Sequence, residues 1–101
     1  MANSKNSIKI GEESYELKPV KMKYIKDGFY SKYRILKDKG FVELVSKFTD
    51  GTEITEGFLK AVFDKEEIPV DMIDNLDVDI IKDLIEKAAK MNEIVDEEKN
   101  V

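Results

Sequence analysis

Cysteine and histidine are both absent from this chain of 101 residues. Without cysteine, the chain can form neither a disulfide framework nor a thiolate zinc site, and it has no cysteine nucleophile. Without histidine, it lacks the commonest general base and the commonest metal ligand. These two absences exclude most hydrolase active sites, so we expect no catalytic residues, no metal site and no cofactor.

Long apolar runs are missing as well. No segment approaches the ~20 consecutive apolar residues that a membrane-spanning helix needs, and the polar residues 1–7 lack the apolar stretch of a signal peptide. We therefore expect no membrane contact and a cytoplasmic location. The chain length suits a single domain without a deep cleft between lobes.

The charged residues are distributed unevenly along the chain, whose net charge is −5. Residues 1–50 hold eleven Lys and Arg against seven Asp and Glu, whereas residues 51–101 hold six against fifteen. This asymmetry favours association between oppositely charged surfaces. The overall acidity argues against general binding of nucleic acid.

The apolar pattern predicts an α+β fold that is mainly helical, with an N-terminal β-hairpin followed by about four short-to-medium helices. Alternating apolar residues predict strands over 7–10 and 14–20, and the hairpin must lie on a helix because two strands alone are marginally stable. We expect a flexible arm at 1–7, one domain at 8–94 and a disordered acidic tail at 95–101. The expected helices are 21–39, 41–48, 55–64, a single turn after Pro69, and 77–94.

Turn and cap residues set the limits of these helices. Gly40 is expected to end the first helix, and Asp77 is expected to cap the last. Thr55 is the predicted N-cap of the third helix. The Asp50-Gly51 pair would also suit a tight hairpin turn, and we favour a helix–turn–helix. Four phenylalanines at helical spacing are predicted to fill the core: Phe41, Phe48, Phe58 and Phe63.

The helix predicted over 21–39 would carry a basic row at steps of three or four residues. This row is a candidate surface for an acidic partner or for phosphates, although a merely solvated face would have the same pattern. Its members are Lys23, Lys26, Tyr30, Arg34 and Lys37.

Two further rows would share that helix. One is apolar and contains Met22, Ile25, Phe29, Tyr33 and Leu36. The other, with small residues at its centre, is a candidate interface where another helix approaches over a glycine. Alternatively, this second row packs beneath the hairpin or the last helix. Its members are Tyr24, Gly28, Ser31 and Ile35.

An acidic stretch follows in the second half of the chain. Its spacing does not match the ligand positions of a calcium-binding loop. We interpret it as a candidate self-association surface that answers the basic row within one chain or between neighbours. The candidate residues are Glu66, Glu67, Asp71 and Asp74.

The N-terminal segments Ile8-Lys9-Ile10-Gly11 and Tyr15-Glu16-Leu17-Lys18-Pro19-Val20 precede a basic amphipathic helix, short helices and a charged tail. This order resembles the tail assembly chaperones of bacteriophages and phage-tail-like particles. The resemblance implies a non-enzymatic protein of the host cytoplasm that binds the long helical tape-measure protein and recruits tail-tube subunits, with self-association as a further expectation. Two alternatives stay open: a small regulatory adaptor that binds an acidic protein, and a nucleic-acid-binding regulator.

Overall fold

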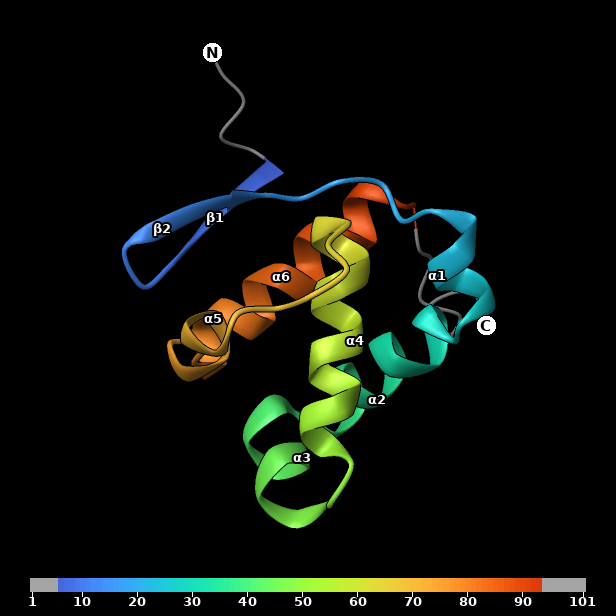
Figure 1. The fold of residues 1–101 in the computed structure, drawn as a ribbon. Coiled ribbons are helices and arrows are strands. Elements are labelled where there is room, and N and C mark those ends of the chain that lie inside the picture. The colour runs from blue at the N-terminus through green and yellow to red at the C-terminus, as the bar shows by residue number, and fades with distance from the viewer. Residues whose placement is uncertain (1–5, 94–101) are drawn as a thin grey trace.

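The computed structural model describes residues 6–93, in which a two-stranded antiparallel hairpin precedes six helices (Figure 1). This arrangement confirms the mainly helical α+β class. Ser7, which the sequence places both at the end of the predicted arm and at the start of the first predicted strand, is the first residue of β1. The rest of the predicted arm up to residue 5 and the predicted acidic tail at 95–101 lie outside the described residues.

The hairpin pairs β1 (Ser7–Ile10) with β2 (Glu13–Glu16), in a register that places Ile10 opposite Glu13. β2 ends at Glu16, whereas the sequence predicted a strand that continues to residue 20. Ile8, Ile10 and Leu17 are buried against the helices. The amide of Lys18 donates to the carbonyl oxygen of Val62 at 2.8 Å, which ties the end of the hairpin to a helix.

The prediction of a single helix over 21–39 is wrong, because this segment forms two helices, α1 (Met22–Lys26) and α2 (Phe29–Lys39). Gly28 lies between them with φ 97°, a conformation that glycine adopts without the strain that a Cβ would cause. The break lets Phe29 turn into the core, where it is 1% exposed. α2 ends before Gly40, as predicted.

The remaining helices are α3 (Phe41–Lys47), α4 (Gly51–Phe63), α5 (Val70–Asp74) and α6 (Val78–Met91). The helix–turn–helix interpretation is confirmed, but Thr55 is not an N-cap. It is buried in the second turn of α4, where its hydroxyl donates to the carbonyl oxygen of Gly51 at 3.0 Å. Asp77 caps α6 as predicted, since its carboxylate accepts from the amide of Ile80 at 2.8 Å.

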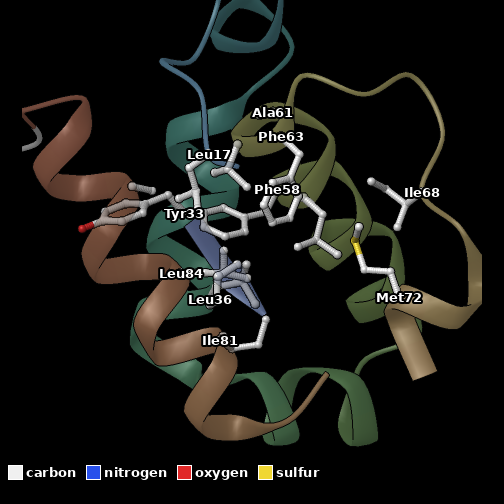
Figure 2. Close-up of a cluster of buried hydrophobic side chains, with 14 of the residues drawn as sticks. Leu17, Tyr33, Leu36, Phe58, Ala61, Phe63, Ile68, Met72, Ile81 and Leu84 are labelled. Carbon is white, nitrogen blue, oxygen red and sulfur yellow. The ribbon is translucent and has the colours of Figure 1, made fainter. Parts of the chain in front are cut away.

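The core surrounds α4, the central helix of the fold (Figure 1). Phe58 is fully buried, and its ring stacks on Phe29 of α2 with centroids 5.8 Å apart. Figure 2 shows Leu36, Ile81 and Leu84 converging with Phe58 from the neighbouring helices. None of the helices within residues 6–93 has the length and hydropathy needed to cross a membrane.

Two of the four phenylalanines predicted as core do not fill it. Phe58 and Phe63 are buried, whereas Phe41 is half-buried and Phe48 is 40% exposed. The reason is that short α3 buries only Leu44, while Phe41 packs at the edge of the core and Phe48 lies just beyond the end of the helix.

Candidate functional site

Four lysines from two regions of the sequence line one hollow of ≈ 380 Å³, which we call the basic pocket. Lys23 and Lys26 come from α1, Lys60 from the last turn of α4, and Lys65 from the loop that follows. Tyr24, Asp27 and Glu66 complete the lining. Neither pair of lysines would make this surface alone.

Asp64 holds the two halves of the basic pocket together. It is the C-cap of α4 with φ 54°, and one of its carboxylate oxygens lies 2.8 Å from the ammonium nitrogen of Lys21. The other oxygen accepts a hydrogen bond from the hydroxyl of Tyr24 at 3.1 Å. The left-handed turn also brings Lys65 back beside Lys60, whose carbonyl oxygen accepts from the Lys65 amide at 3.0 Å.

These contacts shift the pKa values of Asp64 and Tyr24. The hydrogen bond from Lys21 is the main cause that lowers the pKa of the Asp64 carboxyl, and Tyr24 adds to it, although desolvation acts in the opposite direction. Desolvation, and then the hydrogen bond to Asp64, raises the pKa of Tyr24. At neutral pH the pair is therefore an ionised carboxylate and a protonated phenol, which is the combination that the hydrogen bond needs.

The basic pocket carries excess positive charge, because four lysines share its lining with only two acids, Asp27 and Glu66. Within residues 6–93, none of its four ammonium groups forms an ion pair with a carboxylate, whereas Lys21, Lys47 and Lys87 each form one. The ammonium of Lys23 lies 5.1 Å from the centroid of the Tyr24 ring, a cation–π distance. The arrangement suits an anionic group such as a carboxylate or phosphate.

The structure divides the predicted basic row at the Gly28 break. Lys23 and Lys26 enter the basic pocket, but Tyr30, Arg34 and Lys37 lie on α2, away from it. Tyr30 is 40% exposed, and its ring meets that of Phe29 at 5.4 Å. Periodicity could not have found Lys60 and Lys65, because no local pattern links α4 to α1.

The row predicted around Gly28 is not one uniform face, and an interface with a partner helix there stays a prediction. Tyr24 is bonded to Asp64, Ile35 is half-buried against the core, and the nearest group to a Cβ at Gly28 would be the Lys32 ammonium at 3.5 Å. No helix of the described chain approaches there, because Gly28 serves the break itself. The apolar row beside it is covered by the protein's own core at Phe29, Tyr33 and Leu36, and left open at Met22, which is 65% exposed.

A second hollow, of ≈ 260 Å³, lies where the end of α2 and the start of α3 meet the first turns of α6. Its apolar lining is Leu36, Phe41, Val78, Ile81 and Ile85, and its charged lining is Lys37, Lys82 and Glu86. We call this hollow the apolar groove. Sequence reasoning had placed Lys37 in a basic row rather than at an apolar site.

α3 extends the apolar groove with exposed side chains. Val45 and Phe48 follow Phe41 at helical spacing and are 39% and 40% exposed, and Val42 beside them is 55% exposed. We call the groove and these side chains together the α3–α6 apolar surface. Single exposed apolar residues are ordinary, but a group of them at the edge of a groove is typical of a binding surface.

The predicted acidic surface is also divided. Glu66 lines the basic pocket, whereas Asp71 lines a different hollow of ≈ 310 Å³. There it meets Glu12 and Glu13 from the hairpin turn, and we call this the acidic hollow. Glu67 and Asp74 are exposed outside both. Across the described part of the chain, no group of acidic side chains is arranged to hold a metal ion.

Fold and surface together define a small, mainly helical α+β protein with a basic pocket at one place and an apolar groove at another. Comparison with protein-family models, with curated proteins and with solved structures finds no match.

Proposed function

We propose that the protein is a non-enzymatic tail assembly chaperone that covers an apolar face of a long helical tape-measure protein and recruits tail-tube subunits to it. The observation that carries the proposal is the α3–α6 apolar surface. The groove is lined by Phe41, and exposed Val42, Val45 and Phe48 follow it in the sequence, which together suit the apolar stripe of an amphipathic helix. The resemblance of the N-terminal segments to tail assembly chaperones supplies the identity of the client.

The size of the surface is compatible with reversible binding. Complete burial of a Val or Phe side chain contributes about 1.5–3 kcal/mol. Because these side chains are already partly covered, a client would gain only part of that from each. A chaperone that must leave the finished tail benefits from such moderate affinity. Lys37, Lys82 and Glu86 at the groove would favour one orientation of the client helix.

Capture of a co-expressed tape-measure protein tests this proposal. Wild-type protein should retain a co-expressed tape-measure protein, and the double variant Val42→Glu with Val45→Glu should lose it, because two charges would enter the apolar contact. Val70→Glu is the matched control, since Val70 is 72% exposed on α5 and lies outside the groove lining. Failure of the wild type to capture the client, or equal capture by the double variant, would overturn the proposal.

A regulatory adaptor that binds an acidic protein is the second candidate, and the four unpaired lysines of the basic pocket favour it. It predicts a one-to-one complex that is lost in Lys23→Gln with Lys26→Gln and kept in Val42→Glu with Val45→Glu. The two candidates therefore give opposite results with the same pair of variants. Folding of each variant can be checked by its helical circular dichroism.

A further inference from the structure

We propose that the basic pocket receives the acidic hairpin turn of a second copy of this chain, so that copies associate head to tail. The inference concerns self-association and stands apart from client binding at the α3–α6 apolar surface. It keeps Asp71 from the acidic surface expected from the sequence, whereas Glu66 lies in the basic pocket itself.

The basic pocket has an excess of positive charge, because its four lysines outnumber Asp27 and Glu66. Four lysines share one hollow and repel one another, and within the described chain none has a carboxylate partner at ion-pair distance. Lys60 and Lys65 are half-buried, so that water solvates them less fully than Lys23 and Lys26. A pair of carboxylates would relieve this repulsion.

The hairpin turn is a suitable ligand on the same molecule. Glu12 and Glu13 are exposed at its tip, and Asp71 lies beside them in the acidic hollow. None of the described residues that line this hollow is cationic, and none of the three carboxylates takes part in an ion pair within residues 6–93. The turn therefore presents negative charge that its own molecule leaves uncompensated.

The turn is also held in place before any binding occurs. A Cβ at Gly11 would lie 3.1 Å from the side chain of Asn75, so the turn rests on the end of α5. At the base of the hairpin, the Tyr15 ring packs on Phe63 with centroids 5.5 Å apart. A ligand fixed in this way loses little conformational entropy when it docks.

Within one copy, Glu12 and Glu13 form no ion pair with the lysines of the basic pocket among residues 6–93, although Lys65 lies 5.9 Å from the ring centroid of Tyr15 near the base of the hairpin. Figure 1 places the hairpin on the left and α1 on the right, with α4 between them. A contact of the turn with Lys23 and Lys26 of α1 would therefore join different copies, and it is heterologous because unlike surfaces meet. Such contacts generate open chains unless the rotation between copies closes a ring.

The composition of the basic pocket favours carboxylates over a nucleic-acid backbone. Asp27 and Glu66 also line it and repel any anion, so the net attraction is smaller than four lysines alone would give. A continuous row of phosphates would meet these acids at more points than a compact pair of carboxylates does. Exposed ion pairs each contribute little, so the association is expected to be weak and sensitive to salt.

Sedimentation velocity at high protein concentration tests the proposal. Wild type should form oligomers in about 0.01 M salt, where the Debye length is about 30 Å, and dissociate in about 1 M salt, where it is about 3 Å. The pocket variant, Lys23→Gln with Lys26→Gln, and the turn variant, Glu12→Gln with Glu13→Gln, should each associate about two- to thirtyfold more weakly. All four positions are exposed, so the fold should persist.

Mixing the two variants gives the decisive result. One has an intact turn and the other an intact pocket, so an equimolar mixture should form heterodimers that cannot grow further. Lys9→Gln with Lys47→Gln removes the same charge outside the basic pocket and should associate like wild type. A monomeric wild type in low salt, oligomers in either variant alone, a mixture without dimers, or retardation of DNA that the pocket variant loses would each overturn the proposal.

Discussion

Asp64 takes the left-handed conformation that ends α4, with φ 54°, and its carboxylate contacts both Lys21 and Tyr24. Asp is among the few residues that adopt this conformation with modest strain. The sequence predicted that a helix ends near Asp64, but nothing local indicated that its carboxylate would bind α1. This one side chain thereby positions Lys23 and Lys26 beside Lys60 and Lys65.

Lys21→Met should raise the pKa of Asp64 toward its ordinary value, and by more than Tyr24→Phe does, because the hydrogen bond from Lys21 is the largest cause of the lowered pKa. Titration of the Asp64 carboxyl carbon by NMR measures both shifts. Lys47→Met, whose lysine pairs with Glu43, is the control and should leave the Asp64 pKa unchanged.

The same contact makes stability depend on acid. Because the pKa of Asp64 is lower in the folded protein than in the unfolded chain, its stabilisation is present above the unfolded pKa of about 3.9 and is lost as the pH falls through the folded pKa. Asp64→Asn should therefore weaken the fall in melting temperature over that range. An ordinary pKa for Asp64 in the wild type would contradict this account.

Two glycines, one between α1 and α2 and the other at the start of α4, have roles opposite to those expected from the sequence. Gly28 was expected to allow close packing, and Gly51 to make a turn. In the structure Gly28 makes the turn with φ 97°, whereas Gly51 begins α4 and lies directly over the carbonyl group of Leu44. The local sequence drew attention to both glycines. Only the structure shows that Gly28 is needed for its positive φ and Gly51 for the close packing of α4 on α3.

Gly51→Ala should lower the free energy of unfolding by about 1–3 kcal/mol, because its Cβ would overlap backbone atoms of Leu44 that cannot move aside. Gly57→Ala is the matched variant in the same helix. There the Cβ meets only the flexible end of the Lys32 side chain. Replacing a glycine inside a helix by alanine should raise the free energy of unfolding by about 0.5–1 kcal/mol. Urea unfolding compares the two, and equal losses would show that α3 and α4 pack less closely than described.

At the scale of the whole molecule, one core joins the hairpin to the helices. Ile8, Ile10 and Leu17 of the hairpin segment belong to the same buried cluster as Leu84 of α6. Two strands alone would be marginal, so the hairpin that carries the acidic turn depends on the helical core for its position. Unfolding of this core should therefore remove the basic pocket, the acidic turn and the α3–α6 apolar surface together.

Leu84→Ala should lower the free energy of unfolding by about 2–5 kcal/mol, because Leu84 is 0% exposed and its truncation leaves a cavity. Helical circular dichroism and tyrosine fluorescence, which also reports Tyr15 in the hairpin, should follow one coincident transition. Val70→Ala, at a residue 72% exposed, should change stability by less than about 0.5 kcal/mol. Separate transitions for the hairpin and the helices would contradict a single core.

The sequence by itself determined the fold class, the position of the hairpin, the end of α2 before Gly40, the turn after Pro69 and the cap at Asp77. Each of these depends on hydrogen bonds or apolar periodicity within a few residues. Only the tertiary structure decided that the chain breaks at Gly28, that Phe48 stays exposed, and that Lys60 and Lys65 join α1. Burial and charge clustering depend on which distant segments meet, and that information is not present in any local pattern.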